Sequence, residues 1–200
     1  LDGTIADTIN AIRDGLNETL RKYNYPEKTY EDVRRAIGNG ARLLVRRCMP
    51  EPDASDDAKV KRVLASYDLA YSRTYLHTRE CYDGMVQMVK ELHARGYRLA
   101  VLSNKQDPYV KGLIRQLLPQ GEMEVVMGQT ELPKKPDPTS ALAIAADWGL
   151  DPADMALVTS VMSFFLMACC FTVVAKDLKR RPARAWLNIP LSVILTAAFI

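Results

Sequence analysis

The chain has 200 residues, of which 48% are hydrophobic, and a formal net charge of +3. This is enough for one domain with an inserted or appended module and a sizeable core, which excludes a disordered chain. The positive charge is local, because one short stretch carries a charge of +4 and the rest of the chain carries −1. The charged residues of this basic stretch are Lys176, Asp177, Lys179, Arg180, Arg181 and Arg184. We therefore expect no nucleic-acid partner.

The N-terminal part of the chain has helical periodicity. Apolar residues at Ile9, Ile12, Leu16 and Leu20 predict a helix over 8–23. Further helices are predicted over 30–37, 41–48 and about 56–77, separated by glycine-rich and proline-rich turns. Together they predict an all-helical module.

From residue 83 onward, helices and strands alternate. Helices are predicted over 85–94, 108–118 and 139–148, and short apolar strands over 99–102, 125–127 and 155–158. This order indicates the α/β fold class, with a doubly wound (Rossmann-like) parallel sheet that carries the helical module as an insertion. Ligands of such sheets bind at the carboxyl ends of the strands.

The C-terminal segment has a different composition. Residues 155–175 include no charged side chain, a length that would span about 30 Å as a helix. The basic stretch and a second apolar run over 185–200 follow. The pattern predicts C-terminal hydrophobic helices over 159–200 and membrane contact through 155–200. A buried core segment is the alternative, although 155–175 is long for one.

The cysteines and the chain ends give weaker signals. Cys48, Cys81, Cys169 and Cys170 have no CxxC spacing, so we expect reduced thiols rather than a zinc site or disulfides. Charged residues interrupt the first positions, so no signal peptide is expected. Because the chain lacks an initiator Met and stops within an apolar run, we expect both ends to be cut.

Three polar motifs follow predicted strand positions. They are Asp2-Gly3-Thr4, Ser103-Asn104-Lys105 and the loop 134–138. Each has an ordinary alternative, such as a turn, a strand end or a solvated loop lysine. Motifs at the carboxyl ends of parallel strands would instead converge on one crevice.

These motifs also carry a family resemblance. LDGTIADT, SNK and KKPDP resemble, in order and spacing, three motifs of haloacid-dehalogenase-like hydrolases over residues 1–158. The resemblance implies a core of 1–8 and 83–158 and a helical cap of 9–82. The runs IGNGARLLVRRCMP and YDGMVQMVKELHARGYRLAVLSNK are similar to phosphoglycolate phosphatases in particular. The family resemblance further implies a cytoplasmic enzyme that hydrolyses a small phosphorylated metabolite with Mg²⁺, through an aspartyl-phosphate.

The resemblance also assigns roles to residues. Asp2 would be the general acid and base, with its backbone carbonyl a metal ligand. Ser103 would donate a hydrogen bond to the phosphoryl group, and Lys135 would neutralise its charge. The other residues expected to bind or aim the substrate are Gly3, Thr4, Asn104 and the cap residues Arg42 and Arg46. More often, such arginines only solvate a helix face.

Two departures from the family pattern stand out. The nucleophilic aspartate would lie two positions before Asp2, ahead of Leu1, and the acidic fourth motif should follow Val158, where the chain reads TSVMSFFLMACC. We therefore expect the core to be incomplete and this chain to be inactive as written, with a fragmentary or chimeric reading frame as the cause. A membrane-anchored, catalytically inactive interaction domain is the alternative. The exact substrate and the oligomeric state are not encoded in a recognisable way.

Overall fold

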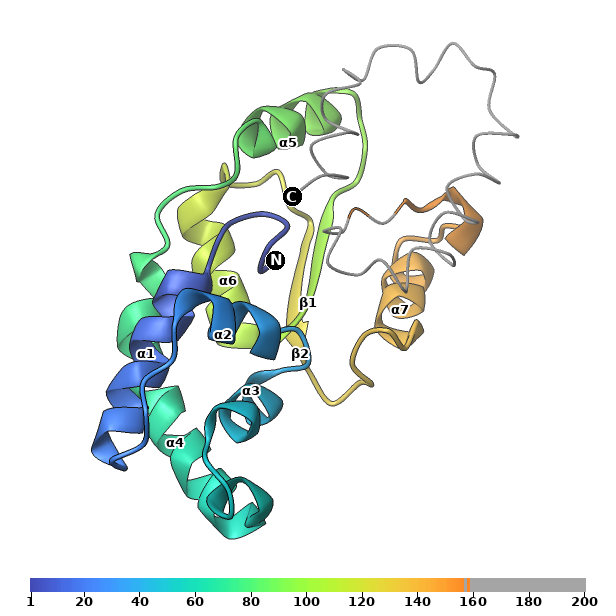
Figure 1. The fold of residues 1–200 in the computed structure, drawn as a ribbon. Helices are drawn as coiled ribbons and strands as arrows, with labels where there is room; N and C mark the ends of the chain where they lie inside the picture. The colour runs from blue at the N-terminus through green and yellow to red at the C-terminus, as the bar shows by residue number, and fades with distance from the viewer. Residues whose placement is uncertain (157, 159–200) are drawn as a thin grey trace. The chain divides into compact units, whose positions relative to one another are not determined.

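The computed structural model describes residues 1–156 and 158 (Figure 1). The chain divides into two compact units, 1–130 and 131–200, and each is described by itself. The first unit contains both the helical module and a parallel sheet.

Four helices make up the helical module. They are α1 (Ile9–Lys22), α2 (Tyr30–Ala36), α3 (Ala41–Cys48) and α4 (Asp57–Thr74), with short 3-10 helices at Asp53–Ser55 and Tyr75–His77. Side-chain caps explain two of the starts: Thr29 and Asp32 form a capping box at α2, and Asp56 caps α4. All four agree with the predicted helices, except that 56–77 is divided between α4 and the 3-10 turn after it.

The module encloses its own hydrophobic cluster. Leu16 and Leu20 of α1 are fully buried and pack with Val60 and Val63 of α4. Gly15 lets the two helices approach, because a Cβ there would lie 3.1 Å from the Cα of Tyr71. The apolar stripe that predicted α1 is therefore the face that joins α1 to α4.

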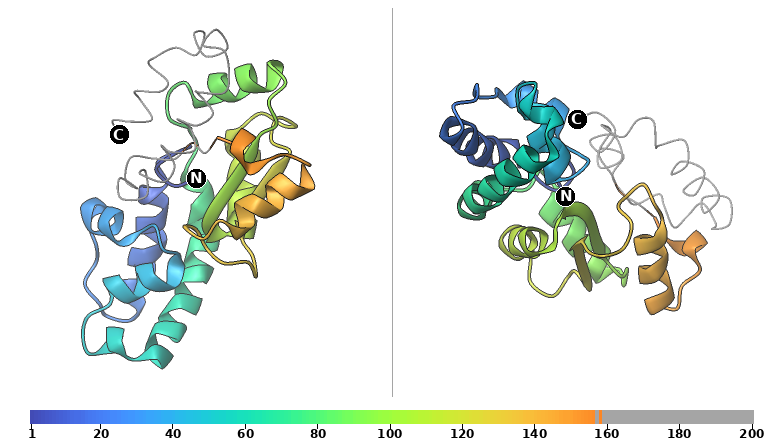
Figure 2. Two further views of the ribbon diagram at one scale, coloured as in Figure 1. Left: turned by 90° about the vertical axis from the view of Figure 1, so that its right-hand side faces the viewer. Right: turned by 90° about the horizontal axis from the view of Figure 1, so that it is seen from below.

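The sheet consists of two parallel strands in the described part of the chain (Figure 2). After α5 (Met85–Ala94), β1 (Ala100–Gln106) is joined by α6 (Asp107–Leu117) to β2 (Val125–Gln129). The ladder pairs Ala100 with Val125 and Leu102 with Met127. The expected parallel α/β arrangement is confirmed at this level, while the doubly wound order remains a prediction.

The end of β1 was predicted wrongly. The strand was expected over 99–102, but an irregular register carries it on until Gln106 pairs with Gln129. Ser103-Asn104-Lys105 therefore lies within the strand and not after it. The apolar pattern ends at Leu102, so only pairing with β2 reveals the polar continuation.

The N-terminal segment packs onto this sheet. Leu1, Ile5 and Ala6 are buried in a second hydrophobic cluster together with Val101 of β1 and Val110 of α6. The Tyr82 backbone N–H donates to the Ile5 carbonyl over 2.9 Å, where the chain leaves the helical module. The segment before α1 and the segment after α4 are thus held side by side.

The second unit contains α7 (Thr139–Asp147) and a 3-10 turn at Pro152–Asp154. The strand predicted over 155–158 is not formed at Met155 and Ala156, and Leu157 lies outside the described residues. No helix within residues 1–156 is both long and apolar enough to cross a membrane. The hydrophobic helices predicted over 159–200 lie outside the described residues, as do Cys169 and Cys170.

Candidate active site

The segment Asp2-Gly3-Thr4 forms a tight turn. The Leu1 carbonyl accepts hydrogen bonds from the backbone N–H groups of Thr4 (3.1 Å) and Ile5 (2.9 Å). Gly3 has φ = 69°, a left-handed conformation that costs glycine little. The sequence predicted this turn, and its effect is to hold the Asp2 side chain at the start of α1.

The Asp2 carboxylate has two side-chain partners. The Thr8 hydroxyl donates to Oδ1 over 2.7 Å. The Lys105 ammonium lies 3.1 Å from Oδ1 and 3.2 Å from Oδ2. The Lys105 side chain is only 8% exposed and that of Asp2 24%, so water screens this ion pair weakly. A carboxylate and an ammonium are thus fixed together where β1 meets the N-terminal turn.

The protonation state of Asp2 follows from these contacts. Burial by itself raises the pKa of the Asp2 carboxyl, but the charges of Lys105 and of the N-terminal amine at Leu1, together with the hydrogen bonds from Thr8 and Lys105, outweigh it. The pKa is therefore below its ordinary value of 3.8. At neutral pH the carboxyl is ionised and ready to accept a proton.

The second motif contributes Ser103 and Lys105 from β1. Ser103 is 7% exposed, and its Oγ accepts a hydrogen bond from the Lys105 backbone N–H over 3.2 Å. Asn104 lies half-buried between them on the strand. Lys105 was not among the predicted site residues. Its place in the motif Ser103-Asn104-Lys105 was the available signal.

The cap residues Arg42 and Arg46 both form ion pairs with an acidic residue of the helical module. Both guanidinium groups bind the carboxylate of Asp57, at the start of α4, with Arg42 Nη2 at 3.1 Å from Oδ1. The structure thus gives these arginines a partner that joins α3 to α4. Their contact with a substrate carboxylate stays a prediction.

Lys135 belongs to the second unit and lies in the loop before α7, as the sequence predicted. The loop is ordered by Asp137, whose Oδ1 accepts a hydrogen bond from the Thr139 backbone N–H over 2.9 Å. Because Asp2 and Ser103 belong to the first unit, the convergence of Lys135 with them stays a prediction.

The residues described here do not by themselves fit a magnesium site. Mg²⁺ is held by several oxygen ligands, commonly carboxylates. In residues 1–156 no group of three acidic or metal-binding side chains is assembled, and the Asp2 carboxylate is occupied by Lys105. Mg²⁺ therefore remains a prediction.

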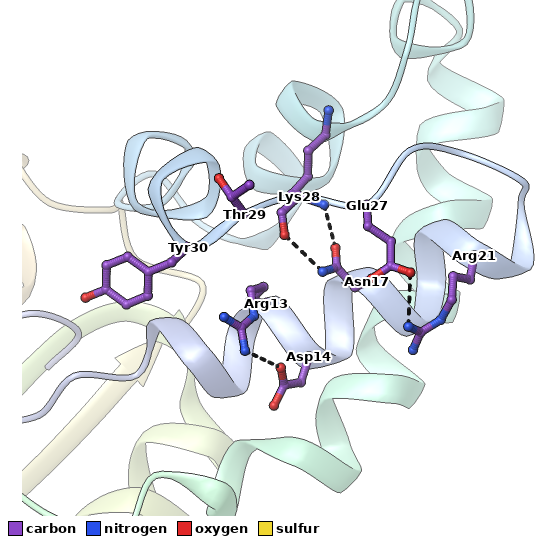
Figure 3. A pocket seen from close by; sticks show the side chains of 8 residues that line it. All are labelled: Arg13, Asp14, Asn17, Arg21, Glu27, Lys28, Thr29 and Tyr30. Carbon is purple, nitrogen blue, oxygen red and sulfur yellow. Dashed lines mark hydrogen bonds and ion pairs between the residues drawn. The ribbon is translucent and has the colours of Figure 1, made fainter.

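A surface hollow of about 620 Å³ lies elsewhere, along α1 and the segment before α2 (Figure 3). Asn17 there forms two hydrogen bonds with the backbone of Lys28, and Arg21 pairs with Glu27 at 3.1 Å. None of the predicted catalytic residues lines it. The hollow is a feature of the helical module and not the candidate site.

Comparison with known proteins establishes the family. The family model "Haloacid dehalogenase-like hydrolase" matches residues 1–159, so the chain belongs to this family. Among curated relatives, the chain is 32% identical over 162 residues to phosphoglycolate phosphatase 1 of Pseudomonas aeruginosa. It is 33% identical over 164 residues to the phosphoglycolate phosphatase of Rhodospirillum rubrum.

Each of these two alignments covers 79% of this chain, but only 59% of the first relative and 68% of the second. A crystal structure from Lactobacillus delbrueckii subsp. bulgaricus is 25% identical, with a TM-score of 0.66, and the match covers 75% of this chain and 71% of that one. The fold with its helical cap is therefore that of the family.

Proposed function

We propose that this protein hydrolyses small phosphate monoesters, with phosphoglycolate as the leading substrate. The observation that carries the proposal is the partly buried Asp2 carboxylate, held by Thr8 and Lys105 where the N-terminal turn meets β1. Membership of a hydrolase family and similarity to phosphoglycolate phosphatases support it. Because the chain spans 59% of the first curated relative, the activity of the whole protein is part of the proposal.

Asp2 would act twice in the reaction. Asp2 first takes up a proton from solvent as the phosphate group binds. A carboxylate then attacks phosphorus to form an aspartyl-phosphate while the bond from phosphorus to the alkoxide breaks, and the departing alkoxide takes the proton from Asp2. Asp2 then removes a proton from water as the water attacks phosphorus, which breaks the bond to the attacking aspartate, regenerates its carboxylate and releases inorganic phosphate. The attacking carboxylate would lie two positions before Asp2, which is ahead of Leu1.

Lys105 imposes an order on these steps. Its charge favours the ionised form of Asp2, so the arriving phosphate has to compete for the ammonium before Asp2 can hold a proton. Ser103, buried beside Lys105, would donate its hydroxyl hydrogen to a phosphoryl oxygen. Lys135, Asn104 and Mg²⁺ would complete the site on the family resemblance alone, and the cap residues Arg42 and Arg46 would meet the substrate's carboxylate.

The test is a phosphatase assay with phosphoglycolate and Mg²⁺ on this chain and on a chain extended upstream to include the aspartate. We expect no activity in the chain as written. Activity in the extended chain would support the covalent mechanism, and equal inactivity of both would point to the acidic fourth motif that does not follow Val158. In the extended chain, Asp2→Asn should lower kcat by about 10²- to 10⁴-fold, the usual contribution of a general acid or base.

Asp14→Asn is the matched control, because Asp14 is an exposed carboxylate on α1. Equal activity of the Asp2→Asn and Asp14→Asn proteins would refute the role of Asp2, and activity of the unextended chain would refute the covalent mechanism. The membrane-anchored, inactive alternative depends on residues beyond the described part of the chain, so it has no support from these contacts.

A further inference from the structure

Lys105 touches the cap as well as Asp2. Its Nζ lies 4.8 Å from the centroid of the Tyr71 ring, which belongs to α4, while remaining 3.1 Å from Asp2 Oδ1. An ammonium within about 6 Å of a ring centroid and over the ring face is attracted by the ring electrons. One buried cation therefore joins the cap helix to the candidate site.

The Tyr71 ring is itself fixed in place. Tyr71 is 2% exposed and stacks on Tyr67, with centroids 5.5 Å apart and planes 13° apart. Tyr109 of α6 meets it edge-on at 5.0 Å. On its backbone side, α1 approaches closely at Gly15. A ring packed on these sides presents a rigid face to Lys105.

The hydroxyl of Tyr71 does not account for a tyrosine at this position. It is buried and has no hydrogen-bond partner within the described residues. A buried hydroxyl in that state destabilises the fold relative to a phenylalanine ring of the same shape. The useful part of Tyr71 is therefore the ring face.

We propose that Tyr71 is a positioning residue, whose ring holds the Lys105 ammonium at the phosphate site from the cap side. This inference rests on the proposed function. A lysine has a flexible four-carbon stem, so its charge is located only as well as its surroundings fix it. A ring fixes the ammonium without neutralising it, which leaves the charge available to an incoming anion.

A packing role alone is the competing explanation, and three variants of the full chain separate the two. Tyr71→Leu removes the ring from Lys105, and Tyr71→Phe restores it without the hydroxyl. Tyr67→Leu is the matched control, because it removes an equally buried ring of the same helix that stacks on Tyr71. Lys105 also acts on Tyr67 through its charge, but the ring that the ammonium lies over is that of Tyr71.

Nuclear magnetic resonance gives the first readout and needs no catalytic activity. Side-chain protons of Lys105 close to the ring face should resonate upfield, with the assignment made by Lys105→Arg. We expect this shift to be lost in Tyr71→Leu and kept in Tyr71→Phe and Tyr67→Leu. An unchanged shift in Tyr71→Leu would overturn the inference.

Binding of inorganic phosphate gives the second readout. Tyr71→Leu should weaken it about 2- to 30-fold, the range that corresponds to the strength of a cation–π contact. Tyr71→Phe should rescue the affinity, and Tyr67→Leu should lower stability while changing the affinity less than about twofold. Equal weakening by Tyr71→Leu and Tyr67→Leu would mean that packing explains the effect and would overturn the inference.

The two readouts also separate this inference from the proposed function. If the upfield shift depends on the Tyr71 ring but the extended chain hydrolyses no phosphate ester, the proposed function fails while the ring contact stands. If the extended chain is active and its KM and kcat are unaffected by Tyr71→Leu, the proposed function stands and the positioning role fails.

Discussion

The ion pair between Lys105 and Asp2 allows a quantitative test by a double-mutant cycle with Lys105→Met and Asp2→Asn. At 3.1 Å, two unit charges attract by about 5 kcal/mol at an effective dielectric constant of ~20. The cost of removing both from water offsets much of that attraction. We expect a net coupling of about 1–3 kcal/mol.

The two single variants should differ. Asp2→Asn leaves Lys105, whose side chain is 8% exposed, as a nearly buried and unpaired charge. Such a loss costs about 3–5 kcal/mol. Lys105→Met leaves the more exposed carboxylate, which water and Thr8 partly satisfy, so its cost should be smaller. The double variant should be more stable than Asp2→Asn alone.

The coupling is measured by urea unfolding at pH 7 of the unsubstituted protein, the two single variants and the double variant. The comparison requires that all four unfold with equal m-values. Because the pKa of Asp2 is lowered in the folded state from its ordinary 3.8, its stabilisation is present above that value. It is lost as the pH falls through the folded pKa. The coupling should therefore disappear in acid.

The pair Arg21 and Glu27 is the matched control, since it has the same 3.1 Å separation but side chains that are 61% and 49% exposed. Its coupling should be about 0–1 kcal/mol. A coupling at Asp2 and Lys105 that is no larger than this, or that persists in strong acid, would refute the assignment of a buried pair.

Three further changes test the fold. Leu16→Ala should cost about 2–5 kcal/mol in urea unfolding because Leu16 is fully buried, whereas Leu69→Ala, at a side chain 62% exposed, should change stability by under about 0.5 kcal/mol. Burial raises the pKa of Asp68, so the folded state disfavours its ionised form; Asp68→Asn should raise the melting temperature at pH 7 and have no effect below about pH 3.8. Asn17→Asp keeps the acceptor for the Lys28 N–H but loses the donor to the Lys28 carbonyl, so it should lower the free energy of unfolding by about 1–3 kcal/mol. A variant as stable as the unsubstituted protein would contradict this pair of hydrogen bonds.

The sequence predicted the helices well for a physical reason. In α1, residues such as Ile12 and Leu16 repeat at helical spacing, and burial against α4 makes that repeat necessary. The end of β1 was missed because Ser103-Asn104-Lys105 is polar and depends on pairing with β2. No local pattern encodes a contact between residues far apart in the chain.

In the candidate site, too, local features could be predicted from the sequence and long-range contacts could not. The turn at Gly3 could be predicted, because its conformation is decided within four residues. The contact between Lys105 and Asp2 spans 103 positions of sequence, and only the packing of the N-terminal segment on the sheet brings the two together. Motif resemblance named Asp2 and Ser103 but not Lys105, although all three lie in the quoted motifs.

The cap and the candidate site are joined by contacts that should change together. Gln106, next to Lys105, donates to Asp68 of α4 over 2.8 Å, one turn before Tyr71. At the start of α2, Tyr30 donates to Asp7 over 2.8 Å, close to Asp2 in sequence. A displacement of α4 from β1 would thus strain the Gln106–Asp68 hydrogen bond and the ring contact of Lys105 at once. A substitution that loosens the cap should therefore alter the electrostatics of Asp2 before it unfolds the protein.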